Sequence, residues 1–289
     1  MKRVYLAGFL LSLGMVWPAL AQEAKTPNPQ GAKPEKLRIK VGVEEERPQF
    51  LPDSENLVIP ENIQQLEKKV KADPKNVDLK FDLLMAYSRT SLLDKAWPVA
   101  LDIDKLDPEY TLKTLKTTEA QLKKNPKDQD ARYRSAMASF ARGLQLKEDA
   151  REKYMEPHRR GEPLPEHWWD DFKSYLQTGD KETAQRLNRP EVTAMLDEVR
   201  SRRTDAEGQL KEILKQDQDQ IWAKNYLAFL SFDRGDLKQA EVLIHESIAK
   251  DPQNPISHLA LGQLYLKQGQ FKEFVEQVKV AFQLRAQGK

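Results

Sequence analysis

The sequence predicts an all-α fold of stacked antiparallel helix pairs that becomes irregular in the middle of the chain. Three observations lead to this prediction. Apolar residues recur at helical spacing from residue 61 onward, proline and glycine separate these amphipathic segments, and the pattern repeats with a period of 34 residues. The chain of 289 residues contains no cysteine. Packing alone must therefore hold such a fold, whatever the redox state of its surroundings.

The first 21 residues have the three parts of a secretory signal peptide. Lys2 and Arg3 precede an apolar run, and the run ends in the small-residue site Ala19-Leu20-Ala21. A membrane anchor is the alternative, but Pro18 interrupts the run, which is short for a span of about 20 residues. A bacterial lipid anchor would need a cysteine at the cleavage site. We therefore expect a periplasmic or secreted protein, with no transmembrane segment after the signal has been cleaved.

Residues 22–60 are predicted to be a disordered, proline-rich linker, because they contain six prolines among many charges. Within this linker, apolar and other residues alternate from Leu37 to Val43, which is the period-two pattern of a half-buried strand. The segment either pairs with another chain by strand addition or is simply extended, since an isolated strand is not stable.

The charge balance argues against a nucleic-acid partner. Once Lys2 and Arg3 are removed with the signal, 45 basic residues face 45 acidic ones. Binding to phosphate backbones depends on a basic excess or a basic stripe. We therefore expect no nucleic acid among the partners.

The repeat is clearest near the C-terminus, where residues of the same type recur 34 positions apart. The pairs are Leu227 and Leu261, Ala228 and Gly262, Gly235 and Gly269, and Asp217 and Asp251. The second helices keep the same register, with Leu210, Ile244 and Val278 in one series and Leu214, Ile248 and Phe282 in another. Small residues allow two helices to cross closely, and glycine suits the reversal between them.

Upstream the repeat is less regular. Ala96 and Pro108 keep the spacing of Ala240 and Pro252, so residues 62–108 hold an earlier unit. Asp73-Pro74 and Asn125-Pro126 lie 52 positions apart, about one and a half periods, which predicts an extra helix around residues 110–124.

A degenerate unit follows from Asp128, with Gly143 expected at its turn. The segment 157–169 has no helical period and three prolines, which indicates a loop or insertion.

The last unit, with Leu261, Gly262, Tyr265, Gly269 and Ala281, resembles the tetratricopeptide repeat family. The resemblance implies a right-handed superhelix, or α-solenoid, whose concave face is lined by the first helix of each unit and holds a partner protein or peptide. It divides the chain into N-terminal repeats (61–156), an irregular helical insertion (157–204) and C-terminal repeats (205–289).

The resemblance also nominates a binding groove. It places Trp222, Asn225, Phe229, Phe232, Ile256, Leu259, Gln263 and Leu266 on the concave side. Aromatic side chains dominate binding hot spots, but the same residues could instead pack against the preceding unit. Some family members grip a terminal carboxylate with lysine and asparagine. Arg89, Asn225 and Lys267 are too scattered along this sequence to suggest that mode.

Catalytic signatures are missing from the sequence. No two of the four histidines (His158, His167, His245, His258) have the spacing of metal ligands on one helix face. There is no glycine-rich phosphate loop, no strand-turn-helix serine and no cysteine nucleophile. We therefore expect neither an enzyme nor a metal or other cofactor.

The sequence thus predicts an exported scaffold or adaptor that binds a partner protein or peptide and serves the assembly or regulation of a cell-envelope complex. The alternative is a cell-wall accessory protein or enzyme that uses residues 157–181, with Glu166, His167, Trp168 and Trp169 contacting glycan. A purely structural homo-oligomer is the third hypothesis.

Overall fold

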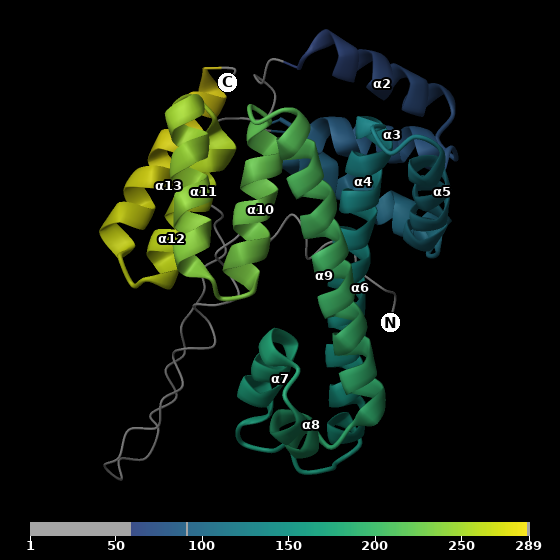
Figure 1. Cartoon of the computed structure of the whole chain (residues 1–289), viewed down its shortest axis with the longest axis vertical. Coiled ribbons are helices and arrows are strands. Elements are labelled where there is room, and N and C mark those ends of the chain that lie inside the picture. The colour runs from purple at the N-terminus through teal and green to yellow at the C-terminus, as the bar shows by residue number, and fades with distance from the viewer. Residues whose placement is uncertain (1–58, 91, 288–289) are drawn as a thin grey trace, which may run out of the picture.

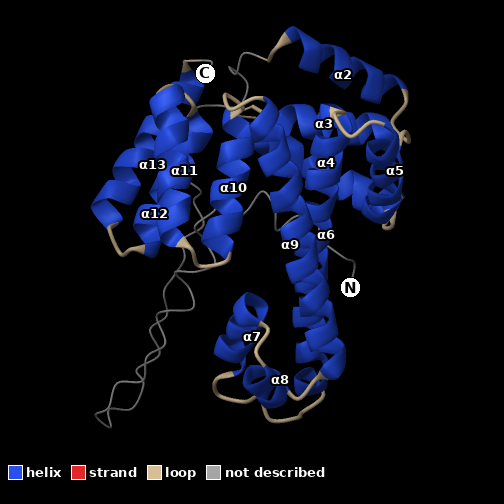
Figure 2. Ribbon diagram, viewed as in Figure 1, coloured by secondary structure: helices blue, strands red, loops and turns tan. Residues whose placement is uncertain are grey.

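The computed structural model describes residues 59–90 and 92–287, which form twelve helices (Figure 1). They are α2 (Glu61–Ala72), α3 (Val77–Ser88), α4 (Leu93–Leu106), α5 (Tyr110–Lys124), α6 (Gln129–Arg159), α7 (Trp168–Thr178), α8 (Lys181–Leu187), α9 (Pro190–Gln216), α10 (Ile221–Asp233), α11 (Leu237–Lys250), α12 (Pro255–Lys267) and α13 (Phe271–Ala286). This part of the chain contains no strand, so the all-α prediction is confirmed (Figure 2).

The predicted signal peptide, the linker as far as residue 58, and the candidate strand at 37–43 lie outside the described residues. Among the helices that are described, none is long and apolar enough to cross a membrane.

Three short helix pairs, α3–α4, α10–α11 and α12–α13, form the repeating part of the fold. Gly235 and Gly269 have φ of 86° and 77° and reverse the chain inside the last two pairs, as their positions predicted. Asn254 caps the N-terminus of α12, because its Oδ1 accepts the backbone N–H groups of Ile256 at 3.0 Å and Ser257 at 3.2 Å.

The small residues predicted at the helix crossings are buried there. Ala228 on α10 is 1% exposed, and the α carbon of Gly262 on α12 faces α13, where an added methyl group would lie 3.5 Å from Phe274. Between the two pairs, Ile244 of α11 packs in one apolar cluster with Leu261 and Leu264 of α12. The stacking of one pair on the next therefore uses residues at the predicted register.

The extra helix expected around residues 110–124 is α5, and the prediction is confirmed. It packs on α3 through Tyr110, whose ring centre lies 5.3 Å from that of Phe81 and whose hydroxyl donates to Asp78 at 2.7 Å. It also contacts α6. A single helix thus separates the first pair from the next unit.

The middle of the chain forms an arm that projects from the helical body (Figure 1). The long helices α6 and α9 pack along each other, and α7 and α8 lie at the far end. The turn expected at Gly143 is wrong: Gly143 lies inside α6, which continues for a further 16 residues. Its α carbon faces Val199 and Arg202 of α9, so the glycine serves a close helix approach instead of a reversal.

The arm is inserted between the two helices of one repeat. Ala206 and Leu210 of α9 are 0% and 2% exposed, the same values as Ala240 and Ile244 of α11, which lie 34 positions further on. The C-terminal part of α9 is therefore the second helix of a unit whose first helix is the N-terminal part of α6. The sequence-based limits at residues 156 and 204 fall inside these two helices.

The arm has its own apolar core. Leu146, Ala150 and Tyr154 follow helical spacing along α6 and pack on Val192 and Leu196 of α9. Phe172, Tyr175 and Leu176 of α7 and Leu187 of α8 complete this cluster. Its contacts are separate from those of the main core, which runs from α2 to α10.

An ion cluster fixes the base of the arm to the C-terminal repeats. Asp233 at the end of α10 pairs with Arg203 of α9 and lies 3.5 Å from the ammonium nitrogen of Lys147 on α6. Burial alone would raise the pKa of Asp233, but Lys147 and Arg203 outweigh it and hold that pKa below its ordinary value. The carboxylate therefore stays charged between two cations.

The stacking register can be tested with Leu261→Ala, which removes a side chain that is 5% exposed. We expect the free energy of unfolding in urea to fall by about 2–5 kcal/mol, because a cavity opens between α11 and α12. Val242→Ala is the control, since Val242 is 51% exposed, and it should change stability by less than about 0.5 kcal/mol. An unchanged urea midpoint for Leu261→Ala would contradict the assigned register.

The ion cluster predicts a pH-dependent effect of Asp233→Asn. At neutral pH the variant should lose about 3 kcal/mol, because Lys147 and Arg203 are left without their counter-charge. The stabilisation from a carboxylate with a lowered pKa is present above its unfolded pKa of about 4 and disappears as the pH falls through the folded value. The difference from the parent chain in urea titrations should therefore shrink below about pH 4.

Asp170→Asn is the matched control, because that carboxylate is 72% exposed and pairs with Lys173 on its own helix. A gap between parent and Asp233→Asn that stayed constant down to pH 3 would mean that Asp233 is not the charged centre of the cluster.

Candidate functional site

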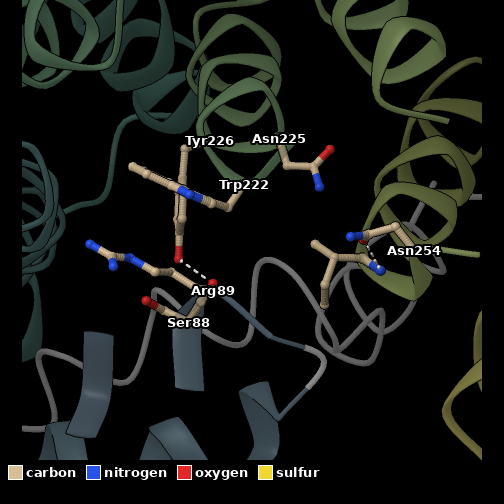
Figure 3. A pocket seen from close by; sticks show the side chains of 7 residues that line it. Ser88, Arg89, Trp222, Asn225, Tyr226 and Asn254 are labelled. Atoms are coloured by element: carbon tan, nitrogen blue, oxygen red, sulfur yellow. Dashed lines mark hydrogen bonds between the residues drawn. The ribbon is translucent and has the colours of Figure 1, made fainter. Parts of the chain in front are cut away.

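The first helices of three pairs converge on a cleft between the C-terminal end of α3, the N-terminal half of α10 and the start of α12 (Figure 3). We call it the α3–α10–α12 cleft, and it is lined by Ser88, Arg89, Trp222, Asn225, Tyr226, Asn254 and Ile256. The empty space in the cleft is about 360 Å³ including the open mouth, and the cavity within it measures about 20 Å³. The interior accepts one side-chain tip or a water molecule, and anything larger must lie across the mouth.

Buried hydroxyl groups hold the wall of this cleft together. The Ser88 hydroxyl donates to the carbonyl of Met85 at 2.9 Å, and its oxygen lies 2.8 Å from the hydroxyl of Tyr133 on α6. The Tyr226 hydroxyl lies 3.4 Å from the carbonyl of Ser88 (Figure 3). Burial raises the pKa of both tyrosines, so both keep their protons and remain hydrogen-bond donors at neutral pH.

Asn225 joins α10 to α12 at the opposite wall. Its Nδ2 donates to the hydroxyl of Ser257 at 3.1 Å, and that hydroxyl lies 3.2 Å from the Asn225 Oδ1. Asn225 is 6% exposed. The buried amide of Asn225 therefore chiefly positions α12. Asn254, which caps the N-terminus of α12, lines the cleft from the other side of its opening (Figure 3).

Arg89 is the exposed cation of the cleft. It follows the last residue of α3, where a positive charge is favourable beside the free carbonyl groups of a helix end. Its guanidinium carbon lies 3.8 Å from the ring centre of Tyr133 and 5.1 Å from that of Trp222. These two rings meet edge to face at 4.2 Å. The aromatic pair thus holds the guanidinium in place.

The indole of Trp222 is fixed as well. Its Nε1–H donates to Gln220 at 2.6 Å, and the ring is only half-buried. Ile256 adds apolar surface at the same mouth. Arg89, Trp222 and Ile256 therefore offer a cation, an indole ring and an aliphatic side chain in the same cleft.

The residues predicted to form the groove divide into three groups. Trp222, Asn225 and Ile256 line the cleft. Phe229 meets Phe140 of α6 edge to face at 5.3 Å, and Phe232 packs against the cluster between α11 and α12. The remaining residues, Leu259, Gln263 and Leu266, are half-buried on α12 and do not line this cleft.

Sequence reasoning missed part of the lining. Arg89 and Asn225 looked scattered along the chain, yet they line the same cleft, whereas Lys267 at the end of α12 does not. Ser88, Tyr226 and Asn254 were not singled out for the groove either. These residues lie close together because α10 and the start of α12 pack near the end of α3. No local signal in the sequence predicts that long-range contact.

The residues of the glycan-binding alternative lie where the arm ends. Trp168 stacks on Tyr154 at 5.3 Å with 14° between the ring planes, so it anchors α7 to α6. Trp169 is 37% exposed and stacks on Phe172 at 5.5 Å. Glu166 and His167 are exposed in the preceding loop. One indole of the pair is therefore structural, and the other is accessible.

The described residues contain no cluster of three or more side chains suited to hold a metal ion. His258, for example, is engaged within the fold, with ring nitrogens 2.8 Å from Gln277 and 2.9 Å from the carbonyl of Pro252.

Residues 231–283 match the sequence model of the tetratricopeptide repeat. The match runs from the last residues of α10 through α11 and α12 into α13, and of the residues that line the cleft it includes Asn254 and Ile256. No curated protein matches the chain.

Proposed function

Since residues 231–283 form a tetratricopeptide-repeat segment, we propose that the chain is an exported scaffold that holds a segment of a partner protein in the α3–α10–α12 cleft. Repeats of this family serve protein–protein interaction. In this proposal, the captured segment brings its parent protein into a cell-envelope complex, which the scaffold helps to assemble or to regulate.

The observation that carries the proposal is the exposed Arg89 guanidinium stacked on Tyr133 and beside Trp222. Arginine and tryptophan are the side chains most enriched among binding hot spots, and here both are held before a partner arrives. Little side-chain entropy is lost when a partner binds to groups that are already fixed. A segment that offers a hydrogen-bond acceptor next to an apolar side chain fits the cation, the indole and Ile256.

Site-specific photocrosslinking can test this proposal in cells of the natural host. A photoreactive phenylalanine analogue at Ile256 should form a covalent adduct with a protein partner. The same group at Val242, which is 51% exposed on the outer face of α11, should not. Adding Arg89→Ala should abolish the adduct without lowering the melting temperature by more than a few degrees, because Arg89 is exposed.

Two further variants sharpen this experiment. Arg89→Lys keeps the charge but loses the planar stack, and it should reduce the adduct less than alanine does. Arg160→Ala, which removes a guanidinium side chain that is 70% exposed on the arm, should leave the adduct unchanged. Adducts that appear equally at Ile256 and Val242 would contradict capture at the cleft. Retention on peptidoglycan that requires Trp169 would instead favour the glycan-binding alternative.

Export is a separate part of the proposal and has its own test. The signal pattern predicts cleavage after Ala21. N-terminal sequencing of the protein recovered from its natural host should therefore begin at Gln22, and fractionation should place it outside the cytoplasm. A protein that retains Met1 and is found in the cytoplasmic fraction would contradict export and the role in the cell envelope. It would not contradict partner binding at the α3–α10–α12 cleft.

A further inference from the structure

The outer surface of α13 carries an apolar stripe. Phe271, Val275, Val278 and Phe282 follow spacings of four, three and four residues, which places them on one face of the helix. Phe271 is 58% exposed and Val275 is 45% exposed, while Val278 and Phe282 are half-buried. We call these four residues the α13 stripe.

The repeat register explains what such a stripe normally contacts. Phe271, Val278 and Phe282 lie 34 positions after Leu237, Ile244 and Ile248 of α11. Those α11 residues all belong to the apolar cluster that includes Leu261 and Leu264 of α12. In α11 the equivalent residues are therefore covered by the first helix of the following pair.

No described helix covers the stripe on α13. Here the stacking positions keep large apolar side chains, and two of them are phenylalanines. A contiguous exposed apolar face of this kind marks an interaction site.

The charges beside the stripe restrict what can cover it. At 100° per residue, Lys272 and Lys279 lie on one edge of the stripe, and both are exposed. Glu273 and Glu276 lie further round the helix, away from the apolar residues. A helix that docks on the stripe therefore meets a basic edge.

A second copy of this chain does not suit that edge. In an antiparallel two-fold pairing through α13, the lysine edge of one helix would face the lysine edge of the other, and like charges repel. Head-to-tail stacking on α2 would bring the same edge to a helix that exposes Lys68, Lys69 and Lys71. An acidic partner meets neither obstacle.

We propose that the α13 stripe is a second docking surface, which binds an amphipathic helix of a partner protein in trans, with acidic residues along the edge that faces Lys272 and Lys279. The docked helix takes the place that α12 occupies on α11. This surface is separate from the α3–α10–α12 cleft, so a scaffold of this kind can hold two partners at once.

Peptides derived from α12 can serve as probes, because α12 is the helix that covers the equivalent residues of α11. Two fluorescent peptides would span residues 254–268, extended by alanine-rich turns to favour helix formation. Their polar positions His258, Gln263 and Lys267 would all be glutamate in one peptide and all lysine in the other. Binding to the full-length mature chain would be followed by fluorescence anisotropy at low and high salt.

The glutamate peptide should bind more tightly than the lysine peptide, and added salt should weaken its binding. The double variant Phe271→Gln/Val275→Gln should weaken it by about tenfold or more, since it removes the two most exposed apolar side chains of the stripe. Both residues are exposed, so circular dichroism and melting should change little. Lys272→Glu/Lys279→Glu should reverse the preference between the peptides, and Val242→Gln on α11 is the matched control without effect.

Several results would overturn the proposal. It fails if the glutamate peptide does not bind, if both peptides bind equally, or if the variants of the stripe bind as the parent chain does. Light scattering that reveals a dimer dissociated by Phe271→Gln would make the occupant a second copy. Binding that appears only after deletion of residues 22–58 would mean that the chain covers its own stripe. None of these results alters the photocrosslinking expected at Ile256, so the two proposals can fail independently.

Discussion

The hydrogen bond between the hydroxyls of Ser88 and Tyr133 sits where three first helices meet. It joins the end of α3 to α6, and the Tyr226 hydroxyl of α10 approaches the same residue from 138 positions further along the chain. These groups are buried, and a buried polar group that loses its partner costs about 1–3 kcal/mol. The network therefore favours one arrangement of the three helices. Arg89, Trp222 and Ile256 come together only in that arrangement.

Local signals explain why so much of the fold was readable from the sequence. The turn glycines Gly235 and Gly269 and the helix-starting Asn254 act through their own backbone, so a sequence pattern can identify them. The extra helix α5 followed from the distance between two proline-marked helix ends. At these positions, the helix propensity of the residues, the glycines and prolines at the helix ends and the tertiary packing all favour the same structure.

The failures arose where tertiary packing overrides such local signals. Gly143 has the residue type and the position of a turn, yet α9 packs against it and α6 continues through it. Arg89 shows no pattern of its own, because its importance comes from two rings on other helices, Tyr133 and Trp222. A site assembled from segments so distant in sequence is not encoded by any periodic pattern. Phe229 and Phe232 were predicted to line the groove, but they make internal contacts instead. Aromatic residues at helical spacing suit either role, so the sequence pattern does not distinguish the two.

The insertion of the arm within one repeat, instead of between two repeats, has a mechanical consequence. The 16 residues of α6 beyond Gly143 extend for about 24 Å at 1.5 Å per residue, with α9 packed alongside and the arm's own apolar core at the far end. Both helices run uninterrupted into the repeat, and Asp233 clamps their base through Arg203 and Lys147. The arm is therefore a strut rather than a tether. Trp169 at its tip is thus kept at a set distance and orientation from the cleft.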